Sequence, residues 1–221
     1  MTSLPSRDAF ILPKPPAGHA PATRRRFPRL LALVVLPLFL AGCIYEEVLL
    51  HETELVFEST GTVRITELIE GKLTEEILED IAQDGPAGWD IFADNIDQLL
   101  QRENVFDEHL GSSVTPLGDG FVRIELAGRD RIDQTSLDNP IRLSDAQLYR
   151  DGPEHWLVRI FPTQQFDAPT PLCVTIEPGW AFADGTDAGL VTDSADRVCV
   201  DRNEASVSRR YVNIQLHRTG G

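Results

Sequence analysis

The chain has 221 residues and a formal net charge of −15, with 35 acidic against 20 basic side chains. Residues 43–221 alone hold 34 acidic and 14 basic side chains, so this part is more acidic than the whole. Nucleic acid is not expected as a partner, because its phosphates need a basic surface, and anionic lipid headgroups are repelled. The acidity favours a solvated, self-repelling surface over a site for cations or a basic partner.

The first 42 residues have the order of an export signal. A leader rich in proline and alanine precedes a basic cluster and then an apolar run, Leu30 to Leu40; the cluster is Arg24, Arg25, Arg26 and Arg29. A positive segment, a short apolar segment and small residues at the cut are the parts of a secretory signal peptide. The apolar run is too short for a membrane span, which needs about 20 residues. We expect export and removal of residues 1–42.

The signal ends in Leu40-Ala41-Gly42-Cys43, which resembles the lipobox of bacterial lipoproteins at all four positions. The resemblance implies a diacylglycerol on the Cys43 sulfur, cleavage before Cys43, and often a further acyl chain, such as palmitate, on the new amine. Two or more acyl chains hold a protein stably on a membrane. Ile44 implies sorting to the outer membrane, and the basic cluster also resembles a twin-arginine signal. A tether of only residues 43–47 would keep the domain close to the bilayer.

Residues 48–218 are long enough for one domain with its own core. Segments 48–58 and 62–69 predict a hairpin around Ser59-Thr60-Gly61, because polar and apolar residues alternate and Gly61 can take the positive φ of a tight turn. Thr74 is a typical N-cap for a helix over 74–83, which Gly85-Pro86 would end.

A second helix is expected over 91–102, capped by Asp90, with Phe92 and Ile96 on its apolar stripe. The rest of the chain is rich in alternating strands, with a turn at Gly118-Asp119-Gly120 and a hairpin at Arg150-Asp151-Gly152-Pro153. We therefore predict an α+β fold, a mainly antiparallel sheet with an N-terminal hairpin and two helices packed on one face.

Cys173 and Cys199 remain once Cys43 carries lipid. In an oxidising envelope compartment two such thiols most often form one disulfide, and a reactive thiol beside a histidine is the alternative. Both cysteines fall on the face of their strands opposite the apolar residues, which predicts a bridge between facing strands on the less buried side.

Motifs for catalysis or cofactor binding are not recognisable, and no cofactor is expected. The segment 111–113, Gly-Ser-Ser, lacks the pattern of a nucleophile elbow and reads as a loop. His51-Glu52-Thr53-Glu54 lacks the second histidine of a zinc helix, and its strand-like context predicts a surface or edge position. The four histidines of the mature chain, His51, His109, His155 and His217, are scattered. Weak calcium candidates are four aspartates near the C-terminal strands: Asp184, Asp187, Asp193 and Asp196.

These observations favour a membrane-anchored envelope lipoprotein that binds a ligand or another envelope protein, or serves assembly, without catalysis. One alternative is an envelope hydrolase with a carboxylate- or histidine-based site, which would need such groups to converge in a cleft. Another is a structural module stabilised by calcium.

Overall fold

The computed structural model describes residues 44–103, 105–143, 146–161, 168–184, 186, 191–202 and 211–219. The signal segment and Cys43 therefore lie outside the described residues. Among the helices that are described, none is long and apolar enough to cross a membrane.

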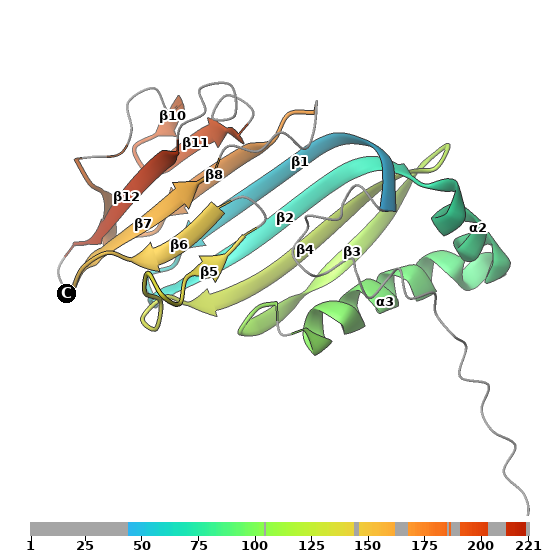
Figure 1. Ribbon diagram of the computed structural model, residues 1–221, viewed down its shortest axis with the longest axis horizontal. Helices are drawn as coiled ribbons and strands as arrows, with labels where there is room; N and C mark the ends of the chain where they lie inside the picture. The colour runs from blue at the N-terminus through green and yellow to red at the C-terminus, as the bar shows by residue number, and fades with distance from the viewer. Residues whose placement is uncertain are drawn as a thin grey trace, which may run out of the picture.

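Two sheets make up most of the domain (Figure 1). In their order across sheet A, its seven strands are β10 (Val191–Ser194), β11 (Arg197–Asp201), β8 (Pro171–Ile176), β1 (Tyr45–Phe57), β2 (Thr62–Leu73), β4 (Phe121–Arg131) and β3 (Glu108–Gly118). Sheet B has five, β5 (Ile141–Arg142), β6 (Ala146–Arg150), β7 (His155–Ile160), β12 (Val212–Arg218) and β9 (Trp180–Phe182). Neighbouring strands are antiparallel except β1 and β8, which run parallel.

The strands of sheet A are too long for the shorter strands of sheet B to cover along their whole length. β1 and β2 have 13 and 12 residues, whereas β7 and β12 have 6 and 7. At about 3.3 Å per residue, the long strands exceed the short ones by nearly 20 Å. The helices α2 (Glu75–Gln83) and α3 (Gly88–Arg102), joined by the 3-10 turn η2 (Gly85–Ala87), cover the remaining length (Figure 1).

The inward-facing apolar residues of the long strands therefore belong to two hydrophobic cores on one face of sheet A. The sandwich core lies between the sheets and includes Leu55, Val63 and Ile65. The helix core lies under α2 and α3 and includes Ile69 and Leu73, the next inward-facing apolar residues of β2. Burial of these side chains contributes about 1.5–3 kcal/mol each, before the entropy cost of ordering them.

The α+β class is confirmed, and the two helices do pack on one face of a mainly antiparallel sheet. A second sheet, which the sequence did not predict, covers the rest of that face. Period-2 alternation shows that one face of a strand is buried and does not show what buries it. Sheet B and the helices share the same face of sheet A, each covering part of it.

The helices begin slightly differently from the expectation. α2 starts at Glu75 after Thr74, whose side chain makes no capping hydrogen bond. α3 starts at Gly88 rather than 91, so Asp90 lies in its first turn and is not its N-cap. Gly85-Pro86 ends α2 as expected, but the chain continues through η2 directly into α3 because proline is well tolerated at the first position of a helical turn.

The segment 111–113 belongs to strand β3, and its prediction as a loop is wrong. β3 is the edge strand of sheet A and most of its residues are exposed or half-buried, so its side chains show no apolar alternation. Gly111, with φ of 126°, lies at a register shift opposite β4.

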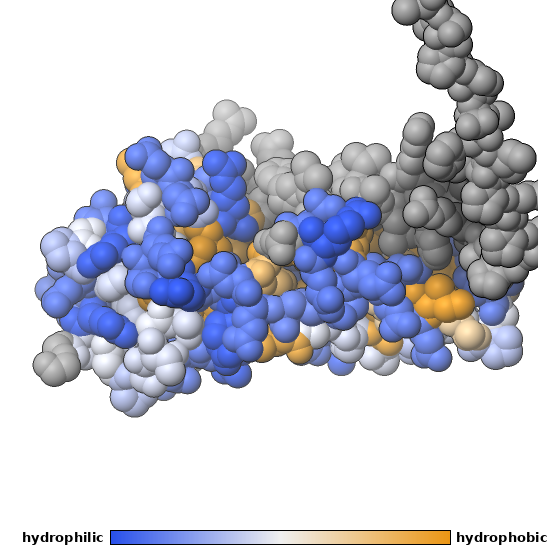
Figure 2. Space-filling view, turned by 90° about the horizontal axis from the view of Figure 1, so that it is seen from below, coloured by the Kyte–Doolittle hydropathy of each residue, from blue (hydrophilic) through white to orange (hydrophobic). Residues whose placement is uncertain are grey.

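Residues 44–47, which the sequence predicts as part of a tether, lie within the fold. Ile44 and Tyr45 are buried in the helix core, and β1 starts at Tyr45. The chain therefore enters the fold immediately after Cys43, at the end of sheet A that carries the helices. The surface seen in Figure 2 is mainly hydrophilic with separate hydrophobic patches, as expected from the acidic composition.

Candidate functional site

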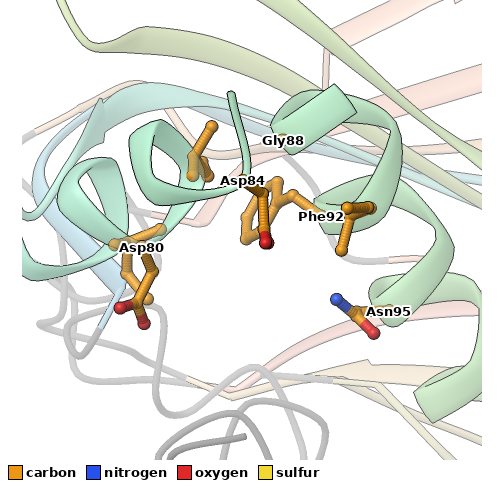
Figure 3. Close-up of a pocket in the computed structure, with 8 residues that line it drawn as sticks. Asp80, Asp84, Gly88, Phe92 and Asn95 are labelled. Carbon is orange, nitrogen blue, oxygen red and sulfur yellow. The ribbon is translucent and has the colours of Figure 1, made fainter. Parts of the chain in front are cut away.

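Two pockets lined by described residues are candidates for a binding site. The first lies between α2 and α3 and is lined by the apolar side chains of Ile77, Ile81 and Phe92. The polar side chains of Asp80 and Asn95 lie on its two sides (Figure 3). Its volume of about 30 Å³ holds roughly one water molecule, so it is too small for a ligand.

The second pocket has a volume of about 340 Å³, within the range of small-molecule sites. We call it the tryptophan–arginine pocket. Its lining residues come from the end of the sandwich where β1, β4 and β12 end. This end of the sheets lies opposite the helices (Figure 1). Five parts of the chain line it, namely the β1–β2 turn, the end of β4, β7, β9 and the end of β12; the residues are Thr60, Gly61, Thr62, Arg131, Ile132, Asp133, Trp156, Trp180 and Arg218.

The tryptophans form a rigid wall. Trp156 and Trp180 meet edge to face with ring centroids 4.9 Å apart, and Phe57 packs edge to face on Trp180 at 5.3 Å. Each indole N–H donates to a backbone carbonyl, from Trp156 to Ile132 at 3.2 Å and from Trp180 to Glu58 at 2.9 Å. Because both indole N–H groups already have acceptors, the two tryptophans offer a ligand their ring surfaces and no hydrogen-bond donor.

Arg218 lies across this wall at the pocket opening. Its guanidinium carbon is 5.4 Å from the centroid of Trp180, within the range of a cation–π interaction. Nη2 is 3.5 Å from the Ser59 carbonyl oxygen, a long contact. A Cβ at Gly61 would lie 2.8 Å from Nη2, so glycine at this turn lets the guanidinium approach the backbone.

Arg131 lies on the other side of the pocket and pairs with Asp133 at 2.9 Å. The hydrogen bond from Arg131 lowers the pKa of Asp133, which keeps this carboxylate charged. The pocket lining therefore holds two guanidinium groups against one carboxylate.

Hydroxyl groups of the β1–β2 turn are linked in a chain. Thr62 donates to Glu58 Oε2 at 2.6 Å, and Thr60 and Thr62 share a hydrogen bond of 2.8 Å. Since the Thr62 proton goes to Glu58, Thr60 is the donor to Thr62. Burial raises the pKa of Glu58, but hydrogen bonds from Arg129 and Thr62 outweigh it and the net pKa is lowered. Both threonine protons are thus committed, and their oxygens face the pocket only as acceptors.

A second polar cluster crosses the inner face of sheet A between the two cores. We call it the polar band: Arg202, Thr170, Thr53, His51 and Glu67, each 5% exposed or less. His51 Nε2 lies 3.7 Å from Glu67 Oε2. The expectation of a surface or edge position for His51 is wrong, because β1 is the middle strand of the seven and His51 faces inward.

Arg202 holds the polar band together through acceptors on neighbouring strands. Its guanidinium donates to the carbonyls of Thr170 at 2.8 Å and His51 at 2.7 Å, and to the Thr53 hydroxyl at 3.2 Å. These contacts join the end of β11 to β1 and to the segment before β8. The band is a structural network, and it does not line either of the two pockets.

One histidine–carboxylate pair bears on the hydrolase alternative. His109 Nε2 lies 2.5 Å from Asp97 Oδ1, and Ser112 donates to the same oxygen at 3.0 Å. The hydrogen bond from His109 lowers the pKa of Asp97. Because Ser112 binds the carboxylate and not the imidazole, this histidine does not activate the hydroxyl as a nucleophile. The cluster joins α3 to β3.

The other residues expected to form sites are distributed as follows. His155 and His217 face each other across β7 and β12, with ring centroids 6.0 Å apart. Asp184 lies in a turn after β9, Asp193 on β10, and Asp196 in the β10–β11 turn, where the Ser194 hydroxyl donates to it. Asp187 is outside the described residues, and the part of the chain that is described contains no group of three or more ligands for a metal. Calcium binding stays a prediction.

The disulfide between Cys173 and Cys199 is present. The two residues are opposite each other on adjacent strands of sheet A, β8 and β11, rather than on facing strands. They lie on the outer face, as the alternation predicted, and this is the less buried side of both strands, although Cys173 itself is 3% exposed.

Asp130 near the end of β4 predicts a dependence of stability on pH. Its side chain is 7% exposed and accepts the Asp107 N–H at 2.7 Å. Burial raises the pKa of Asp130 from 3.8 to about 6, against the effect of this hydrogen bond. The folded state therefore binds more protons than the unfolded state between about pH 4 and pH 6, and stability falls as pH rises through that window.

We expect Asp130→Asn to remove this decrease and to raise the free energy of unfolding at pH 7 by about 1–3 kcal/mol. Urea unfolding at pH 4, 5, 6 and 7 measures it. Asp133→Asn is the matched control, since the pKa of Asp133 is lowered and its removal brings no gain. A decrease of the same size in Asp130→Asn would show that another group causes it.

Sequence reasoning did not select the residues of the tryptophan–arginine pocket. Trp156 and Trp180 are two of only three tryptophans, each at the end of a strand beside a turn, and this scarcity was the one available signal. Arg131 and Arg218 carry no motif that distinguishes them from the other arginines.

Comparison with known proteins identifies no family. No protein-family model matches the chain, and no curated protein matches it. Among solved structures, the folded domain of the LppM protein of Mycobacterium tuberculosis, determined by NMR, is similar at a TM-score of 0.41 and 12% sequence identity, over 80% of this chain and 95% of that chain.

Proposed function

We propose that this chain is an exported envelope lipoprotein, held on a membrane by lipid on Cys43, whose domain acts by binding a small ligand without catalysis. The tryptophan–arginine pocket carries the binding part of the proposal. It is lined by rigid aromatic rings and charged side chains from five parts of the chain, which is typical of small-molecule sites.

The position of the pocket relative to Cys43 supports the membrane part of the proposal. Since Ile44 and Tyr45 are buried in the helix core, the lipid would leave the domain at the end that carries α2 and α3. The 13 residues of β1 then lead to the pocket end, a distance of about 40 Å at 3.3 Å per residue. A pocket at that end faces away from the bilayer and is open to solutes of the envelope.

The acidic residues near Cys43 support an anchor that is made by the lipid alone. The end nearest Cys43 carries Glu46, Glu47, Glu75 and Glu76, which anionic headgroups repel, so the lipid and not the protein surface would provide the membrane contact. Ile44 after the lipidated cysteine makes the outer membrane the proposed location.

Metabolic labelling with palmitate tests the anchor. We expect the chain to take up label and to fractionate with membranes, and Cys43→Ser to lose both properties. Cys173→Ser with Cys199→Ser, which removes the other thiols, should keep the label. An unlabelled wild-type chain, or Cys43→Ser that is processed and fractionates normally, would overturn the proposal.

A further inference from the structure

We infer that the tryptophan–arginine pocket binds the oxyanion of a small ligand, a phosphate or carboxylate group, between Arg218 and Arg131. This inference rests on the proposal that the domain acts by binding in this pocket, and it names the class of ligand.

The first reason is the state of Arg218. In this acidic chain, Arg102, Arg123, Arg129 and Arg197 lie in ion pairs with carboxylates. Arg131 gives one nitrogen, Nη2, to Asp133. Arg218 forms no ion pair within the described part of the chain; it contacts the Trp180 ring and the Ser59 carbonyl. Most of its five N–H groups are therefore left for a ligand, and the planar fork matches the two oxygens of a carboxylate or phosphate.

The second reason is that Arg218 is held in place before a ligand arrives. The indole of Trp180 is itself fixed by its hydrogen bond to the Glu58 carbonyl and by Phe57. A guanidinium lying on this ring loses less freedom on binding than a free surface arginine, which lowers the cost of association.

The third reason is the inventory of donors in the lining. The hydroxyls of Thr60 and Thr62 have committed their protons toward Glu58, and both indole N–H groups are bound to carbonyls. The donors available to a ligand are thus the guanidinium groups, which favours an anion. Asp133 and the threonine oxygens are acceptors, so hydroxyl groups elsewhere on the ligand can also be bound.

Intrinsic fluorescence is the readout, because Trp156 and Trp180 line the pocket and Trp89, the third tryptophan, is on α3. The full-length chain carrying Cys43→Ser is titrated with inorganic phosphate and, separately, with acetate, at constant ionic strength set with sodium chloride. We expect a saturable change with at least one of the two anions. Phosphate alone would assign a phosphate group, acetate alone a carboxylate, and both would assign the shared oxyanion chemistry.

Substitutions test the residues. Arg218→Gln should weaken binding about 10-fold or more, the effect of a charge-assisted hydrogen bond, and Arg131→Gln should weaken it as well. Arg150→Gln is the matched control, because Arg150 lies 5.5 Å from the centroid of Trp156 in the same way but does not line the pocket. Its affinity should match that of the parent. Far-ultraviolet circular dichroism checks that each variant is folded.

Two results would overturn the inference. One is the absence of a saturable response to both anions, and the other is equal weakening by Arg150→Gln and Arg218→Gln. A neutral probe, N-acetylglucosamine, separates the inference of an anionic ligand from the broader proposal that the pocket binds a small ligand. A response to the sugar without a response to either anion would leave binding in the pocket intact and refute the anionic ligand.

Discussion

Replacing Arg202 with alanine is expected to lower the free energy of unfolding by about 3 kcal/mol or more. The side chain is fully buried, and its replacement removes hydrogen bonds to the Thr170 carbonyl, the His51 carbonyl and the Thr53 hydroxyl. A buried acceptor without a partner costs about 1–3 kcal/mol, and the cavity left by the side chain adds to this. Urea unfolding followed by tryptophan fluorescence measures the loss.

Two further variants separate the causes. Arg202→Lys keeps the charge but cannot reach three acceptors with one planar fork, so we expect it to recover only part of the stability. Arg123→Ala is the control, since Arg123 is half exposed and its ion pair with Glu70 is expected to contribute within about 1 kcal/mol. Equal losses in Arg202→Ala and Arg123→Ala would show that the polar band does not stabilise the fold.

Removing the disulfide, with Cys173→Ser and Cys199→Ser together, is expected to lower the free energy of unfolding by about 3 kcal/mol. The bridge closes a loop with a sequence separation of 26 residues. It also fastens β11 to β8 at the Cys199–Cys173 register position, and β10 joins sheet A only through β11. The loss should therefore be concentrated in this part of the sheet.

Urea unfolding of the double variant is compared with the wild-type chain under oxidising conditions and with the wild-type chain after reduction. The reduced chain and the double variant should agree. Amide hydrogen exchange should show faster opening of β10 and β11 than of β1 and β2. Unchanged stability in the double variant would mean that strand pairing alone holds this edge.

Local patterns in the sequence predicted most of the helices and strands, and the disulfide. Alternation at Val63 and Ile65 marks β2 because successive side chains of a strand point to opposite faces. The stripe of Phe92, Ile96 and Leu100 marks α3 because residues three and four apart share one side of a helix. The export signal and the two cysteines that remain besides Cys43 predicted the disulfide between Cys173 and Cys199.

Tertiary structure alone decided what covers each part of sheet A. Val63 and Ile69 have the same pattern in β2, yet one is buried by sheet B and the other by the helices. The difference depends on the lengths of strands in another sheet, which alternation within β2 does not encode. β3 was missed for a related reason, since this edge strand meets α3 partly through polar side chains, His109 and Ser112, and so shows no clear apolar alternation.

The tryptophan–arginine pocket and the polar band were also beyond local patterns. Arg202 reaches the His51 carbonyl across 151 positions, and Arg218 meets the Ser59 carbonyl across 159. Backbone carbonyls are present at every residue, so acceptors of this kind leave no mark in the sequence. Such sites exist only where the fold brings distant strand ends together.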